Sequence, residues 1–154
     1  MKTRRFTLLL VMLLAVFCGT TAMAQNPIRW RCSARMVSST EGELTVRAII
    51  DKGWHLYGMQ MPKSGPKPTV INFSESTGVK FTTPLYSKTK PIKKFDQVFA
   101  SKLQYWEKEA VFVRKFTLTG NKSDVLFKGS ITFMGCDDET CLVPKTENFT
   151  FKLK

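Results

Sequence analysis

Apolar and polar side chains alternate without interruption in the run Ile28-Arg29-Trp30-Arg31-Cys32-Ser33-Ala34-Arg35-Met36. Successive side chains of a β-strand point to opposite faces, so this period of two predicts a strand with one face in a core and the other in solvent. Cys32 falls on the apolar face, together with Ile28, Trp30, Ala34 and Met36. We therefore expect Cys32 to be a small buried side chain on the first strand.

The same period recurs along the rest of the chain, in segments 44–50, 69–73, 79–83, 110–118 and 125–133. Turn residues separate these segments, for example Asp51-Lys52-Gly53 and Gly120-Asn121-Lys122. No segment shows a sustained helical period. About seven to nine short strands with frequent turns predict an all-β fold, an immunoglobulin-like antiparallel β-sandwich without the distant cysteine pair of antibody domains.

Segment 88–108 departs from this pattern. Four lysines surround Pro91, and the run Phe95-Asp96-Gln97-Val98-Phe99-Ala100 follows them. We interpret the segment as a polar connection between strands. Its aromatic residues either pack against the core or belong to a mobile flap that covers a reactive group.

Residues 1–24 have the features of a secretory signal peptide. Lys2, Arg4 and Arg5 precede the apolar run 6–17, and Ala22-Met23-Ala24 is a small-x-small cleavage site. The apolar run is too short to span a bilayer comfortably. We expect export to the periplasm, an oxidising compartment where paired cysteines persist as disulfides, and a single domain over residues 25–154.

Cys18 lies inside this leader and raises the alternative of a lipoprotein. Phe17 stands where a lipid-attachment site needs a small residue. Anchoring through Cys18 is therefore the minor alternative.

The formal net charge of the full chain is +12, and removal of Lys2, Arg4 and Arg5 lowers it to +9. A basic balance is compatible with nucleic-acid binding, but an exported protein rarely meets nucleic acid, and here the basic residues are scattered along alternating strands. We interpret them as solvated strand faces. Docking to an acidic partner or to an anionic membrane surface is the second interpretation.

Two cysteines four residues apart lie in Gly135-Cys136-Asp137-Asp138-Glu139-Thr140-Cys141-Leu142-Val143-Pro144, between alternating runs at 125–134 and 149–153. A disulfide that closes so short a loop contributes only about 2 kcal/mol of stability. Strained or exposed disulfides are also the redox-labile ones. The spacing slightly favours a redox-active pair over a purely structural bond.

Four motifs occur in this order: Gly53-Trp54-His55-Leu56-Tyr57, Gly65-Pro66-Lys67-Pro68-Thr69, Phe95-Asp96-x-x-Phe99, and Gly135-Cys136-x4-Cys141-x-x-Pro144. Together they resemble the N-terminal periplasmic domain of the thiol:disulfide interchange protein DsbD, especially its Bacteroidetes-like versions. The resemblance covers almost the whole chain after the leader. It implies an immunoglobulin-like domain whose cysteine pair accepts electrons from a membrane-embedded thiol reductase and passes them to periplasmic thioredoxin-like proteins.

The resemblance also implies roles for individual residues. Cys141 would form the mixed disulfide with a partner, and Cys136 would resolve it. The segment 95–100 matches the cap loop of the family, in which Phe99 is the better candidate for the lid and Val98 the second; Asp96 belongs to the same loop. His55 and Tyr57 match positions that line the site.

The chain departs from the family in two respects. The well-known loop of this family has five residues between its cysteines, whereas this loop has four. Full-length members continue into a membrane domain and a thioredoxin-like domain, and neither follows before Lys154. We therefore expect the electron source to be a separate protein.

Other functions remain open at this stage. An exported protein- or glycan-binding module would use a structural disulfide and exposed aromatic residues such as Tyr105 and Trp106. A metal site built from Cys136, Cys141, His55 and Cys32 would lack the second matching cysteine pair of structural zinc sites. A hydrolase lacks a nucleophile motif beside the single histidine. We expect no cofactor and no metal.

Overall fold

The computed structural model describes residues 26–97 and 99–154. In it the alternating run forms strand β1 (Ile28–Met36), an edge strand that pairs antiparallel with β2 (Glu41–Ile50). The register sets Cys32 opposite Val46 and Trp30 opposite Ala48. Burial along β1 alternates as expected, with the arginines in solvent. The alternation therefore predicts both the strand and its inner face correctly.

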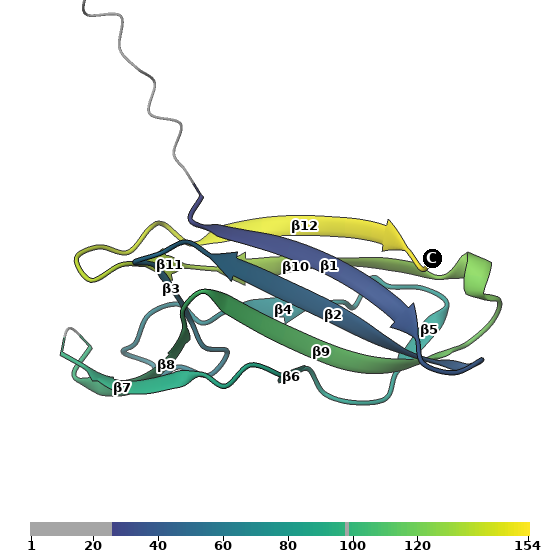
Figure 1. Ribbon diagram of the computed structural model, residues 1–154, viewed down its shortest axis with the longest axis horizontal. Helices are drawn as coiled ribbons and strands as arrows, with labels where there is room; N and C mark the ends of the chain where they lie inside the picture. The colour runs from purple at the N-terminus through teal and green to yellow at the C-terminus, as the bar shows by residue number, and fades with distance from the viewer. Residues whose placement is uncertain (1–25, 98) are drawn as a thin grey trace, which may run out of the picture.

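Two antiparallel sheets make up the body of the molecule (Figure 1). The first has the order β1-β2-β9-β5, with β6 also paired to β9; the new strands are β9 (Glu109–Leu118), β5 (Val79–Phe81) and β6 (Tyr86–Ser87). The second has the order β12-β10-β4, from β12 (Lys145–Lys152), β10 (Leu126–Phe133) and β4 (Val70–Asn72). A 3₁₀ turn, η1 (Lys122–Asp124), links the two sheets.

The core between these sheets is dominated by phenylalanine. Phe112 and Phe116 of β9 and Phe127 of β10 are almost fully buried. The rings of Phe116 and Phe127 meet edge to face with centroids 5.2 Å apart, a preferred arrangement for aromatic pairs. The predicted all-β, immunoglobulin-like sandwich is confirmed.

A third sheet closes one end of the sandwich and was not expected. It has the order β11-β3-β8-β7, from β11 (Gly135–Cys136), β3 (His55–Tyr57), β8 (Ser101–Trp106) and β7 (Ile92–Asp96). In Figure 1 it lies at the end of the molecule opposite η1. This sheet carries both the cysteine loop and the aromatic segment that precedes Ala100.

The interpretation of segment 88–108 as a plain connection is therefore wrong. Its residues form the antiparallel hairpin β7–β8, with Phe95 opposite Lys102 and Asp96 opposite Ser101. Strand β7 is an edge strand with four exposed residues in succession, so neither of its faces is buried in a core. Without a buried face there is no selection for alternating apolar residues, and the period-two signal is missing.

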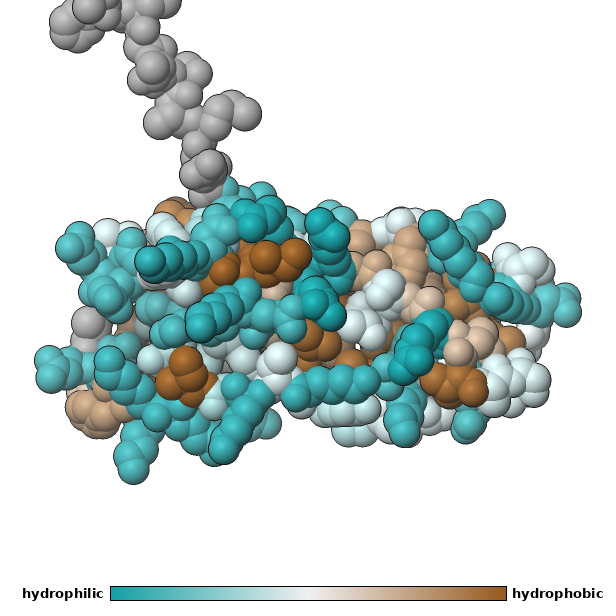
Figure 2. Space-filling view, viewed as in Figure 1, coloured by the Kyte–Doolittle hydropathy of each residue, from teal (hydrophilic) through white to brown (hydrophobic). Residues whose placement is uncertain are grey.

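The basic residues are spread out. In Figure 2 hydrophilic side chains are distributed over the whole visible face, and apolar side chains are exposed between them. The polar positions of β1 illustrate the reason, since Arg29, Arg31 and Arg35 alternate with inward-facing residues. Within residues 26–97 and 99–154, no helix is long and apolar enough to cross a membrane.

Gly42 of β2 leaves room for the core ring opposite it. A Cβ atom added there would stand 2.1 Å from Cζ of Phe116. We expect Gly42→Ala to destabilise the fold by about 1–3 kcal/mol through overpacking, measured by denaturant unfolding. Gly120→Ala is the control, because nothing lies within 4 Å of its added Cβ; equal stabilities of the two variants would contradict the prediction.

Candidate functional site

The two loop cysteines are joined by a disulfide across a tight hairpin. Cys136 and Cys141 are bridge partners with Cα atoms 4.1 Å apart. The N–H of Leu142 donates to the carbonyl of Gly135 and that of Asp137 to the carbonyl of Thr140, both at 2.9 Å. The four-residue spacing thus places the cysteines directly opposite each other.

Asp137, the first of the three acidic residues between the two cysteines, has a structural role. Oδ1 of Asp137 accepts hydrogen bonds from the backbone N–H groups of Thr140, at 2.6 Å, and Glu139, at 2.9 Å. These backbone donors hold the pKa of Asp137 below its usual value. Aspartate commonly closes turns in this way, so Asp137 stabilises the hairpin that brings the sulfurs together.

The two cysteines differ sharply in exposure. Cys136 is fully buried at 0 %, whereas Cys141 is exposed. Cys136 belongs to a small cluster with Tyr57, Leu103 and Met134, separate from the main core. Solvent therefore reaches the residue Cys141, whereas Cys136 is closed off from it.

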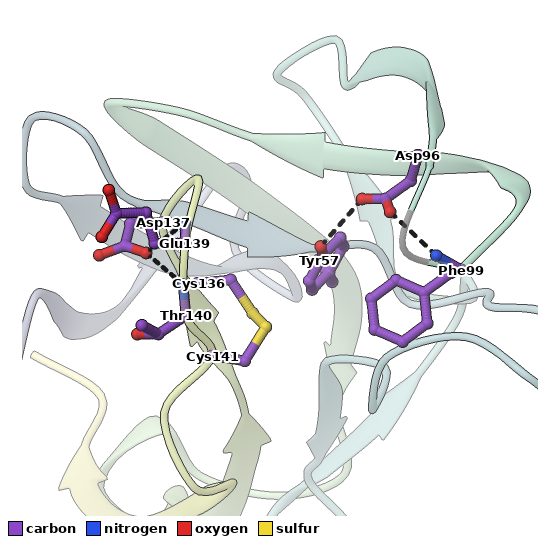
Figure 3. The surroundings of a disulfide bond; sticks show 8 residues. All are labelled: Tyr57, Asp96, Phe99, Cys136, Asp137, Glu139, Thr140 and Cys141. Carbon is purple, nitrogen blue, oxygen red and sulfur yellow. Dashed lines mark hydrogen bonds between the residues drawn. A yellow bond between two sulfur atoms is a disulfide. The ribbon is translucent and has the colours of Figure 1, made fainter.

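Aromatic and sulfur-containing side chains complete the surroundings of Cys136. Phe99, Tyr105 and Met61 pack against its cluster as partly buried residues. Figure 3 shows Tyr57 and Phe99 on the same side of the disulfide. The Tyr57 and Phe99 rings are perpendicular, with centroids 6.3 Å apart.

Asp96 ties the tip of the β7–β8 hairpin to this cluster. Its carboxylate accepts a hydrogen bond from the N–H of Phe99 at 3.1 Å and another from the hydroxyl of Tyr57 at 3.4 Å (Figure 3). Burial and the adjacent Asp96 raise the pKa of Tyr57 to about 12, so the phenol keeps its proton as a donor. Ala100 turns the chain back with a left-handed φ of 46°.

His55 is half-buried on β3, directly opposite Cys136 of β11. Its ring lies 5.0 Å from the rings of both Tyr57 and Tyr105. Burial lowers the pKa of His55, while nearby carboxylates, Asp138 foremost, act in the opposite direction. The imidazole therefore belongs to the face that holds the disulfide.

The structure thus brings together six of the seven residues expected at the site, namely Cys136, Cys141, Asp96, Phe99, His55 and Tyr57. The seventh, Val98, lies outside the described residues, as do the expected signal peptide and Cys18.

Cys32 is separate from this group. It is a free, half-buried thiol that lines a cavity of about 260 Å³ with Trp30, Glu147 and Phe149, between β1 and β12. Burial, and then the charge of Glu147, raise the pKa of Cys32 to about 12, so the thiol is protonated and unreactive at neutral pH. Cys32 is bonded to neither loop cysteine, and it is less buried than expected.

Leu103 and Met134 are members of the Cys136 cluster that sequence reasoning missed. Met134 directly precedes Gly135-Cys136 at the end of an apolar alternating run, which is a usable signal. Leu103 had no such signal, because the strand that carries it was not recognised.

Comparison with models of known protein families shows to which family this chain belongs. Residues 21–153 match the family model described as "Thiol:disulfide interchange protein DsbD, N-terminal". The chain belongs to this family. The resemblance drawn from the four motifs is confirmed, whereas a search of curated protein sequences finds no match.

Solved structures agree on the fold of this DsbD N-terminal family member. The reduced DsbD N-terminal domain of Neisseria meningitidis superposes with a TM-score of 0.52 at 17 % identity, over 79 % of this chain and 83 % of that one. The N-terminal periplasmic domain of ScsB from Proteus mirabilis superposes with a TM-score of 0.58 at 16 % identity, over 86 % of this chain and 49 % of that one. At these identities the likeness concerns the fold.

Proposed function

We propose that this protein performs thiol–disulfide exchange through the Cys136–Cys141 pair. The observation that supports this most directly is the asymmetry of the pair: Cys141 is an exposed residue, and Cys136 is buried beside it in an aromatic cluster. A bond that served only as a link between strands would not need one accessible cysteine. Membership of the DsbD N-terminal family supports the same chemistry.

The chemical steps follow from this asymmetry. A thiolate of a reducing partner attacks the Cys141 sulfur, the Cys136–Cys141 bond breaks, and its electron pair stays on the Cys136 sulfur. The Cys141 mixed disulfide is then cleaved by a second thiol of the partner, which leaves the partner oxidised and both cysteines reduced. The reduced pair transfers its two electrons to the next disulfide by the same steps in reverse.

We assign the two partners by family membership. The electron source would be a membrane-embedded thiol reductase and the acceptors periplasmic thioredoxin-like proteins. The ScsB relative is described as a periplasmic domain, and the leader-like residues 1–24 support export of this chain.

Exposed apolar side chains near the disulfide support a protein partner. Leu142 and Val143 follow Cys141 directly and are 39 % and 86 % exposed. Ile92 and Phe95 of β7, in the hairpin whose tip packs on the Cys136 cluster, are 41 % and 56 % exposed. Exposed apolar groups next to a reactive cysteine, as Leu142 and Val143 are next to Cys141, are typical of a protein-docking surface.

The segment 95–100 would act as a cap over the pair. Phe99 packs on the Cys136 cluster and is tied to Asp96, while Phe95 points away from that cluster into solvent. A docking partner that displaces Phe99 would gain access to the disulfide. Small thiols would meet a partly covered bond, and this limits unspecific reduction.

The reduction potential of the Cys136–Cys141 pair tests the proposal. We expect a value near or above about −270 mV, the range of thioredoxin, because an exchange pair must be reducible by its partners. Titration with glutathione redox buffers and mass spectrometry of the trapped forms give the value. A potential well below about −300 mV marks a structural disulfide and would favour the exported binding module instead.

The binding-module alternative gains no support from the aromatic residues first considered for it. Trp106 is 5 % exposed, packs on Phe112 in the core and donates its Nε1–H to the carbonyl of Thr89 at 3.1 Å. Tyr105 is half-buried and packs on the Cys136 cluster.

A further inference from the structure

The position of His55 in the third sheet gives it a specific relation to the buried sulfur. His55 and Cys136 are cross-strand partners in the β11–β3 pair. Directly opposite residues point to the same face of a sheet, with Cβ atoms typically about 4.5–5.5 Å apart. Tyr57, two residues along β3 and on the same face, belongs to the cluster that buries Cys136. The imidazole is therefore the titratable group that the sheet register sets beside this cysteine.

Thiol–disulfide exchange creates a negative charge on the sulfur of Cys136, where burial disfavours it. Cys136 is completely buried, and each step that makes or breaks the Cys136–Cys141 bond either forms a thiolate there or starts from one. A buried thiolate without a compensating group is strongly disfavoured. A neighbouring group that takes up or supplies a proton removes this barrier.

The other charged groups around His55 are unsuited to this task. The charged groups that act on His55 are the carboxylates of Asp96 in β7, of Glu107 directly after β8, and of Asp137 and Asp138 in the cysteine loop. Ionised carboxylates repel a nearby thiolate. The rings in contact with His55 are those of Tyr57 and Tyr105, and Tyr57 retains its proton at neutral pH.

We propose that His55 is the proton acceptor and donor for Cys136. As the Cys136 sulfur attacks Cys141 in a mixed disulfide, its proton passes to the neutral imidazole, the new S–S bond forms, and the partner leaves as a thiolate. In the opposite direction the imidazolium returns the proton to the Cys136 sulfur when the disulfide is broken. This role rests on the exchange function proposed above.

The pH dependence follows from the state of the imidazole. Burial lowers the pKa of His55 from 6.5, so at pH 7 the neutral, proton-accepting form predominates. The rate of resolution by Cys136 should rise with pH up to the pKa of His55 and then level off. Without the imidazole the thiol must ionise to solvent, and the rate should continue to rise through pH 8.

The reaction of the reduced protein with dithiobis-nitrobenzoate separates the two steps. Attack by Cys141 releases one thionitrobenzoate and leaves a mixed disulfide; attack by Cys136 then releases the second. Both releases are followed by absorbance in a stopped-flow instrument, and Cys136→Ala identifies the first. We expect His55→Gln to slow the second release roughly 10²-fold at pH 7, with the first unchanged, and to abolish the levelling of its pH profile.

His55→Tyr separates proton transfer from packing, since it keeps a ring against Tyr57 and Tyr105 but does not titrate near neutrality. We expect it to behave as His55→Gln does. Three outcomes would overturn the proton-transfer role of His55 and leave the exchange function intact. They are a wild-type pH profile in His55→Tyr, equal slowing of both releases, and an unchanged pH profile in His55→Gln. A wild-type protein that releases only one equivalent would overturn the exchange function and the role of His55 with it.

Discussion

Cys136→Ala should trap mixed disulfides with thioredoxin-like proteins through Cys141, and Cys141→Ala should abolish exchange. The reason is the difference in burial between the two residues: Cys141 is exposed and is the one that a partner can attack, whereas Cys136 is fully buried and resolves the intermediate. When the resolving thiol is missing, intramolecular release is impossible and the intermediate accumulates. Non-reducing electrophoresis and mass spectrometry of the linked peptides detect it.

Cys32→Ala is the matched control for this experiment. Cys32 is a free, half-buried thiol whose pKa is raised to about 12, so its loss should leave trapping and exchange unchanged. If Cys141→Ala accumulates the mixed disulfide and Cys136→Ala does not, the roles of the two cysteines are reversed.

Asp96→Ala should accelerate reduction of the disulfide by glutathione about tenfold. The carboxylate of Asp96 accepts hydrogen bonds from Phe99 and Tyr57 and so holds the hairpin tip on the cysteine cluster. A hydrogen bond to a charged group contributes about 1.5 kcal/mol or more. Its loss should therefore raise about tenfold the population of molecules in which the tip of the β7–β8 hairpin is detached from the cysteine cluster. The measurement is the rate of reduction by glutathione, quenched by alkylation and counted by mass spectrometry.

Asp124→Ala is the control for this variant, because Asp124 lies in η1 at the opposite end of the sandwich (Figure 1). Phe99→Ala should accelerate reduction in the same direction as Asp96→Ala, since it removes the ring itself from the cluster. Wild-type rates in both cap variants would show that the tip does not limit access to the disulfide.

The sequence is most informative where a strand has one buried face. In β1 and β2 that face selects apolar residues at every second position, so the strands and the placement of Trp30 and Val46 can be predicted. The hairpin β7–β8 could not be predicted in this way, because β7 exposes four successive residues and imposes no such selection. Its Phe95-Asp96-x-x-Phe99 motif was recognisable only through the family.

The sequence by itself determined the strand pattern, the family motifs and the close cysteine pair, because each depends on residues that are near neighbours in the chain. Only the tertiary structure decided that Cys136 is buried and Cys141 exposed, and that Asp96 holds Tyr57 across a separation of 39 residues. The same holds for the pairing of His55 with Cys136. These relations depend on strand register and on the packing of the third sheet against the sandwich, which bring together segments that are far apart in the chain.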